Sequence, residues 1–124
     1  MKSKWIEYQT KRILFIDLSD FQDDVEKFRA ELAEGIADTG AEVYKQPLNS
    51  ILVLVNLTNT TMTKTSNQLL SDAIVDTKKY ILRTAVVGMT GFRKVFLDYF
   101  GRLAASETGS FEDLESAKKW LVRK

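Results

Sequence analysis

The chemistry open to this chain is limited first by two residue types that it lacks. Its 124 residues include no cysteine and no histidine. This excludes thiolate nucleophiles, disulfides, imidazole bases and the usual ligands of zinc and iron. Carboxylates, lysines and hydroxyls remain, and no pair of them is spaced so that the chain must bring the two groups together. We therefore predict no catalytic residue, no metal site and no cofactor.

The best-placed polar residues form a threonine-rich segment from Thr58 to Ser66, which follows a strongly apolar run and precedes an amphipathic one. In α/β sheets, ligands commonly bind at the carboxyl ends of strands, and the N–H groups at a helix start favour anions. The segment is our first candidate for binding a ligand or partner. In the alternative interpretation, its hydroxyls only cap the helix. The candidate residues are Thr60, Thr61, Thr63, Thr65 and Ser66.

A second candidate is the short segment from Gly88 to Gly91, which contains Met89 and Thr90. Its glycines would let the backbone approach an anion, and two basic residues follow on the next turn. The segment lacks the Gly-Lys-Ser/Thr ending of a P-loop and the three glycines of a dinucleotide fingerprint. A threonine helix cap beside a glycine is the other explanation. Met89 and Thr90 are kept as candidate binding residues.

Alternating apolar and amphipathic segments predict the elements that must position these residues. The expected strands are Trp5–Tyr8 and Ile13–Leu18, joined as a hairpin by Gln9–Arg12, then Ile51–Val55, Ala85–Val87 and a weak strand near Phe111. Four helices are expected. The first starts near Ser19 or Asp20 and ends near Gly40, and the second runs through Leu70 to Tyr80. The third covers Phe92–Leu103, and the fourth follows a cap at Asp113.

This order of strands and helices predicts the fold class. We expect a single α/β domain over residues 1–124, with a mixed, mainly parallel sheet of four or five strands flanked by about four helices. An antiparallel hairpin would open the sheet. The unbroken apolar run Ile51–Val55 is typical of a strand buried on both faces, so it should be central.

Charge and hydropathy restrict the partners. The net charge of +1 gives no general attraction to nucleic acid, and the longest apolar run is too short to insert into a membrane. We expect a cytoplasmic protein.

Residues 20–42 hold eight acids and two bases, whereas residues 78–102 hold six bases and one acid. Opposed charged faces of this kind are usually solvated helix surfaces, but they can also steer a charged partner or head-to-tail association.

The expected third helix carries more aromatic residues than packing on one side requires. Phe92, Phe96, Tyr99 and Phe100 would occupy nearly half of its circumference. Two interpretations stay open: neighbouring helices cover these aromatic residues, or the residues form an apolar groove for a lipid-like ligand or a contact in a homodimer.

Five stretches also carry a family resemblance through their order and spacing: Trp5–Tyr8, Ile13–Ser19, Ile51–Leu57, Ala85–Gly91 and Phe111–Leu121. Together they resemble the STAS superfamily, the domains named for sulfate transporters and anti-sigma-factor antagonists. The likeness is to its small, stand-alone, SpoIIAA-like bacterial members of unassigned role. It implies a sheet of four or five strands flanked by helices.

In well-understood STAS proteins, a serine at the start of the helix after the central strand is phosphorylated to switch partner binding. Gap-free counting places Thr65 and Ser66 at that position, with hydroxyls expected to face solvent. The resemblance thus implies that Ser66 and Thr65 are candidate phosphoacceptors. Lys64 and Asn67 stand where the family has an acidic residue and a glycine.

These observations favour a non-catalytic regulatory or protein-binding module of STAS type, whose partner is another protein. The alternative is a carrier or sensor of a small apolar or anionic ligand. An enzyme is the least favoured reading because no histidine or cysteine is present.

Overall fold

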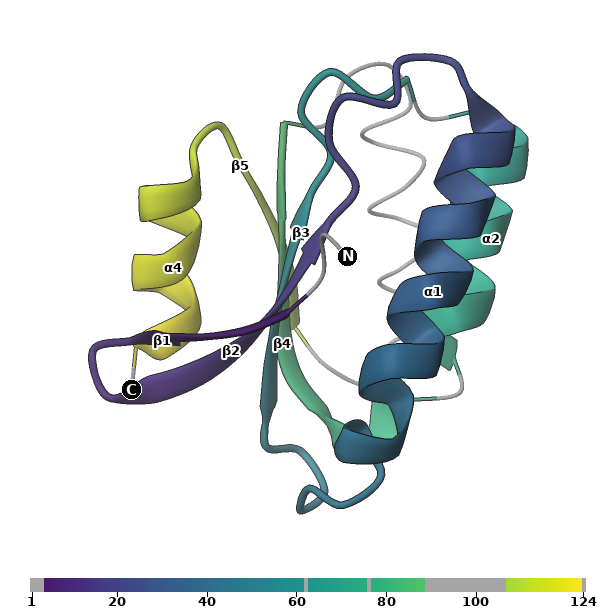
Figure 1. The fold of residues 1–124 in the computed structure, drawn as a ribbon. Helices are drawn as coiled ribbons and strands as arrows, with labels where there is room; N and C mark the ends of the chain where they lie inside the picture. Colours follow the sequence, from purple (N-terminus) through teal and green to yellow (C-terminus); the bar gives the residue numbers. More distant parts are fainter. Residues whose placement is uncertain (1–3, 62, 76, 89–106, 124) are drawn as a thin grey trace.

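A five-stranded sheet forms the centre of the computed structural model, which describes residues 4–61, 63–75, 77–88 and 107–123 (Figure 1). The strands follow one another across the sheet in sequence order, the first pair antiparallel and the others parallel. This confirms the predicted fold class. The strands are β1 (Lys4–Tyr8), β2 (Lys11–Asp17), β3 (Ile51–Asn56), β4 (Ile81–Val87) and β5 (Glu107–Phe111).

The opening hairpin is tighter than predicted. Residues Gln9 and Thr10 alone join β1 to β2, with Tyr8 paired to Lys11, whereas the sequence suggested a connection of four residues. Both turn residues have positive φ values, 49° and 69°. Two-residue turns of this kind fit the right-handed twist of paired strands.

Strand β3 is central and buried, as its apolar run predicted. Its alternate side chains enter two cores on opposite faces of the sheet. Val53 and Val55 face one core, whereas Leu52 and Leu54 face the other. Figure 1 shows the corresponding layers: α1 (Val25–Val43) and α2 (Lys64–Val75) lie on one face of the sheet, and α4 (Leu114–Val122) lies on the other. Strand β4 is longer than the predicted Ala85–Val87, and the weak strand near Phe111 is confirmed as β5.

The helices that the structure describes are α1 (Val25–Val43), α2 (Lys64–Val75) and α4 (Leu114–Val122), with a short 3-10 helix, η1 (Lys78–Tyr80). None of the described helices is long and apolar enough to cross a membrane. The expected helix Phe92–Leu103, with its aromatic face, lies outside the described residues.

The predicted limits of α1 are wrong at both ends. The apolar stripe begins at Phe21, but the helix begins at Val25 because the Asp24 carboxylate accepts the backbone N–H of Lys27 at 3.1 Å and caps it there. Phe21 precedes the helix and packs edge-on against Phe28, with ring centroids 6.1 Å apart. The helix also continues past Gly40 to Val43.

The predicted second helix is shorter than its apolar stripe suggested. Helix α2 ends at Val75, so Thr77 and Tyr80 lie beyond it. Tyr80 closes η1 and packs edge-on against Tyr44, with ring centroids 5.6 Å apart. The apolar periodicity of the sequence therefore continues beyond the end of α2 into η1, which is a separate turn.

A charge inside the central strand should unfold the protein. Val53 is 2% exposed on a strand with neighbours on both sides, so Val53→Asp would bury an unpaired carboxylate. The cost is several kcal/mol, out of a typical total stability of about 5–15 kcal/mol. Circular dichroism should show loss of the cooperative thermal transition. Leu82→Asp makes the same change at an exposed strand position and should keep that transition; a cooperatively melting Val53→Asp protein would contradict the inferred burial.

The Asp113 cap of α4 should make the stability of the protein sensitive to acid. Asp113 accepts the backbone N–H and the hydroxyl of Ser116, at 2.7 and 3.1 Å, and these bonds lower the pKa of its carboxyl group. A lowered folded-state pKa stabilises the protein above the unfolded-state pKa, and this stabilisation is lost as the pH falls through the folded value. The difference in Tm between wild type and Asp113→Asn should therefore shrink on acidification. A constant difference in pH-dependent melting would argue against the cap.

Candidate functional site

The carboxyl ends of β2 and β3 are joined by a network of polar side chains. Asp17 and Asn56 are register partners at the last positions of these strands. Oδ1 of Asp17 accepts the hydroxyl and the backbone N–H of Ser19, at 2.6 and 3.2 Å, and lies 3.5 Å from Nδ2 of Asn56. Oδ1 of Asn56 accepts the hydroxyl and the N–H of Thr58, at 2.7 and 3.1 Å. These bonds turn the chain out of each strand. Within the described residues, no cluster of three acidic side chains could hold a metal ion.

Thr60 joins the loop after β3 to the loop after β2. Its side chain is buried, and Oγ1 donates to the carbonyl of Leu18 at 2.5 Å and accepts the N–H of Phe21 at 3.2 Å. The next N–H, of Thr61, donates to the carbonyl of Gln22 at 2.7 Å. The Thr60 side chain therefore holds the two loops together, and its role in binding a ligand or partner stays a prediction.

Thr63 and Ser66 cap α2 reciprocally. Oγ1 of Thr63 accepts the N–H of Ser66 at 3.2 Å, and Oγ of Ser66 accepts the N–H of Thr63 at 2.7 Å. The capping alternative is thus confirmed for these two residues. Ser66 is 1% exposed, so the expectation that its hydroxyl faces solvent is wrong: that hydroxyl forms part of the cap. Thr65 lies on the same helical turn with an exposed side chain.

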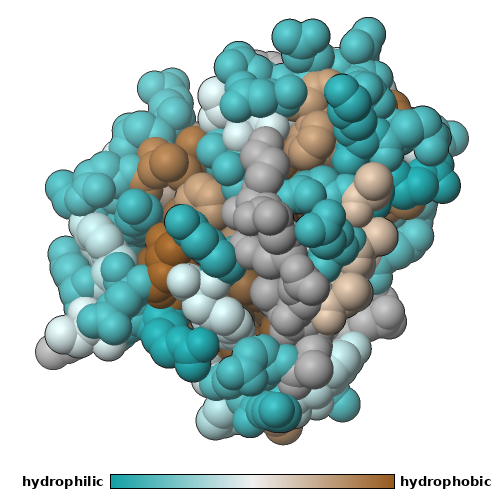
Figure 2. All heavy atoms as spheres, viewed as in Figure 1, coloured by the Kyte–Doolittle hydropathy of each residue, from teal (hydrophilic) through white to brown (hydrophobic). Residues whose placement is uncertain are grey.

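The exposed residues of the two loops and the first turn of α2 form what we call the carboxyl-edge surface. Three of them, Asp20, Gln22 and Asn59, have positive φ values of 66°, 53° and 58°. The amide of Asn59 donates to the carboxylate of Asp20 at 2.9 Å across the two loops. In Figure 2 the upper part of the molecule, where these loops lie, is mainly hydrophilic. The surface consists of Asp20, Gln22, Asp23, Asp24, Thr58, Asn59, Thr61, Lys64 and Thr65.

Gly88 supports this surface from the end of β4. Its φ is +76°, and an added Cβ atom would lie 2.5 Å from Oγ1 and 2.8 Å from Cα of Thr58. Only glycine therefore lets the loop after β3 pack over the end of β4. This close approach explains the glycine without a phosphate ligand. Met89 and Thr90, the candidate residues that follow, lie outside the described residues.

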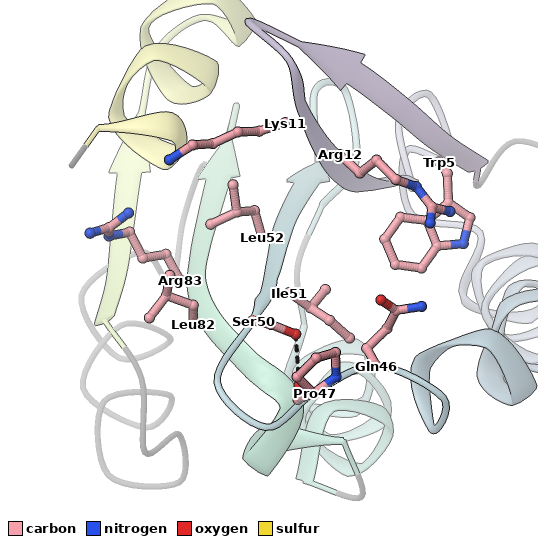
Figure 3. Close-up of a pocket in the computed structure, with 10 residues that line it drawn as sticks. All are labelled: Trp5, Lys11, Arg12, Gln46, Pro47, Ser50, Ile51, Leu52, Leu82 and Arg83. Atoms are coloured by element: carbon pink, nitrogen blue, oxygen red, sulfur yellow. Dashed lines mark hydrogen bonds between the residues drawn. The ribbon is translucent and has the colours of Figure 1, made fainter.

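A hollow at the opposite edge of the sheet was missed by the sequence analysis. It has a volume of about 380 Å³ and lies at the amino ends of β2, β3 and β4 (Figure 3). Lys11, Arg12 and Arg83 line it. The sequence pattern predicts that Lys11 and Arg12 lie in the turn of the hairpin, and nothing in that pattern indicates that a third cation lies beside them. The wider separation of acidic and basic faces stays a prediction, since much of residues 78–102 lies outside the described residues.

Comparisons with known proteins support the fold. No family model matches the chain, and no curated protein matches it. One similar solved structure is that of an uncharacterised protein of the DUF3478 family, with a SpoIIAA-like fold, from Shewanella loihica PV-4. The two superpose with a TM-score of 0.71 at 14% sequence identity, covering 96% of this chain and 91% of that one. The fold is therefore SpoIIAA-like, as the STAS resemblance predicted.

The reciprocal cap makes a testable distinction among three neighbouring hydroxyls. Thr63→Ala and Ser66→Ala should each lower the free energy of unfolding by about 1 kcal/mol, because each removes hydrogen bonds from the start of α2. Thr65→Ala, the matched control, should change it little because that side chain is exposed. Urea denaturation followed by circular dichroism measures all three. Equal stability of Ser66→Ala and Thr65→Ala would contradict the cap.

Proposed function

We propose that this protein is a non-catalytic regulatory module of STAS type, which binds another protein through the carboxyl-edge surface. In this proposal Thr65 is the residue at which an added negative charge would switch binding. Ser66, the other candidate phosphoacceptor, is unsuited because its buried hydroxyl caps the helix.

The observation that carries the proposal is the conformation of three surface residues. Asp20, Gln22 and Asn59 lie side by side in adjoining loops with φ values in the left-handed region. Each such conformation costs a non-glycine residue about 1 kcal/mol and persists only where the surrounding structure enforces it. Here Thr60 and the backbone bonds between the loops enforce it. Three of the six described non-glycine residues with positive φ thus share one polar surface, whereas the other three, Gln9, Thr10 and Asn49, lie in turns elsewhere. Several such residues enforced together by contacts between two loops are typical of a recognition site.

The chemistry of this surface suits a protein partner. Its described residues offer carboxylate, amide and hydroxyl groups, and the hollow beneath them, lined by Phe28 and Ser66, has no room for a water molecule. Loops that are already fixed by hydrogen bonds lose little conformational entropy when they bind. A polar surface held in this way favours protein recognition over binding in an apolar small-molecule pocket.

We propose no catalytic role because the carboxylate at the end of β2 has a structural one. Oδ1 of Asp17 accepts two hydrogen bonds from Ser19 and so holds the turn that follows the strand. The chain also has no histidine or cysteine to act in its place. The SpoIIAA-like fold supports a module of this type at the level of architecture.

Thr65 is suited to a charge switch by its place in the helix. It is exposed on the first turn of α2, where the helix dipole and the free N–H groups favour negative charge. A phosphate there would add nearly two negative charges to the carboxyl-edge surface without disturbing the cap. Partner binding should respond while folding does not.

The test compares charge changes on and off the surface. Thr65→Glu and Thr61→Glu place a carboxylate on the carboxyl-edge surface, and Ala33→Glu adds the same charge at an exposed position in the middle of α1. We expect the three variants to melt within a few degrees of wild type, since surface changes are usually worth less than about 0.5 kcal/mol. Affinity capture from a lysate of the source cells, read by quantitative mass spectrometry, should lose a specific protein only with the first two variants. If all three capture what wild type captures, the carboxyl-edge surface is not the binding site.

A further inference from the structure

The hollow at the amino ends of the strands combines cations with an apolar floor. Figure 3 shows Trp5 and Arg12 on one side and Lys11 and Arg83 on the other, with aliphatic side chains between them. One of these, Leu82, is 38% exposed although it is a large apolar residue. Ile51 and Leu52 are buried, so Leu82 supplies the exposed aliphatic surface that the described residues leave uncovered.

Two of the three cations bind carbonyl oxygens at the end of α4. Nζ of Lys11 donates to the carbonyl of Val122 at 3.2 Å, and one guanidinium nitrogen of Arg83 donates to the carbonyls of Leu121 and Arg123 at 3.0 and 2.9 Å. These bonds satisfy the last carbonyls of α4. They also fix two positive charges at the side of the hollow.

Arg12 is the cation whose donors are available. Its guanidinium lies 4.4 Å from the centroid of the Trp5 ring, and its side chain is exposed. Among the described residues it forms no hydrogen bond or ion pair, and none joins it to its register neighbour Glu7. Stacking on an indole holds the guanidinium plane in place while its N–H groups remain able to bind an anion.

The lining of the hollow selects the class of ligand. It contains three cations and no carboxylate, although Glu107, outside the lining, pairs with Arg83 at 3.8 Å. The positive charge of Lys11 and Arg12, which have no acidic partner among the described residues, favours an anion. The volume of about 380 Å³ lies at the lower end of the range for small-molecule sites. An anionic group beside Arg12 would leave an attached chain in the hollow, where Leu82 is the exposed aliphatic residue.

We propose that this hollow binds a small organic anion, with the acidic group on Arg12 and a short apolar body on the floor. The site is separate from the carboxyl-edge surface. The two lie at opposite ends of the six-residue strand β3, roughly 20 Å apart at about 3.3 Å per residue. Ligand binding here and protein binding there can therefore be tested independently.

The test uses three probes that separate the acidic group from the apolar body: octanoate, octanol and inorganic phosphate. The chain contains two tryptophans, Trp5 in the hollow and Trp120 on α4, so an ¹H–¹⁵N NMR spectrum gives one indole signal for each. Octanoate should shift the Trp5 signal with a dissociation constant in the millimolar range, as expected for so small a ligand. Octanol and phosphate should each bind about tenfold more weakly or worse.

Two matched arginine variants locate the anion. Arg12→Gln should weaken octanoate binding about tenfold, since it removes a charged hydrogen-bond donor. Arg29→Gln removes an exposed arginine from α1 and should leave binding unchanged. Both variants should keep the wild-type melting curve.

Several outcomes would overturn the proposal. A Trp5 signal that no probe shifts means that the hollow binds none of these ligands. Equal binding of octanol shows an apolar site, and equal binding of phosphate shows a simple anion site. Unchanged octanoate affinity in Arg12→Gln places the anion elsewhere. None of these results depends on whether the carboxyl-edge surface binds a protein.

Discussion

Strand β3 must be apolar on both faces and hydrogen-bonded along both edges, and the other described elements are arranged around that requirement. Its register partners are β2 on one side and β4 on the other. The side chains on its two faces are covered by α1 and α2 on one side and by α4 on the other. A strand in this position has no solvent-facing side chain along its length, so it can contribute to recognition only at its two ends.

The two ends differ because the strands are parallel. At the carboxyl ends the chain leaves each strand through a loop, and the loops after β2 and β3 are tied together by Thr60. The result is a closed, polar surface. At the amino ends, the side chains of Lys11, Arg12 and Arg83 surround an open hollow. The same parallel arrangement thus produces a rigid surface at one edge and a cavity at the other.

The sequence predicts the parts of this structure that depend on local patterning. The apolar run of β3, the hairpin and the Asp113 cap all follow from neighbouring residues, and the structure has each of them. The start of α1 was misplaced because Phe21 continues the helical period while packing on Phe28 from outside the helix. A stripe of apolar residues indicates which positions are buried, whereas a capping residue indicates where the helix begins.

The candidate site could be located from the sequence, but the roles of its residues could not. The order of strand and helix placed Thr58–Ser66 at the carboxyl edge. Whether Thr60 points inward depends on the loop after β2, which is about forty residues away in sequence. The hollow depends on still longer separations, since Lys11, Ser50 and Arg83 meet only in the folded sheet. Neither the loop contacts of Thr60 nor the lining of the hollow produces a periodic pattern in the sequence.

The strand order has a consequence for how the chain folds. Each described strand neighbours the strands that precede and follow it in sequence, so no pairing skips over an intervening strand. The sheet can therefore grow from the β1–β2 hairpin by adding one strand at a time, and each addition closes a single connection. Folding rate falls as contacts join more distant parts of a chain, and mixed α/β domains lie between fast helical bundles and slow β-barrels. Sequential strand order keeps each strand pairing in this domain between neighbours in sequence, which limits the length of chain that each pairing must close.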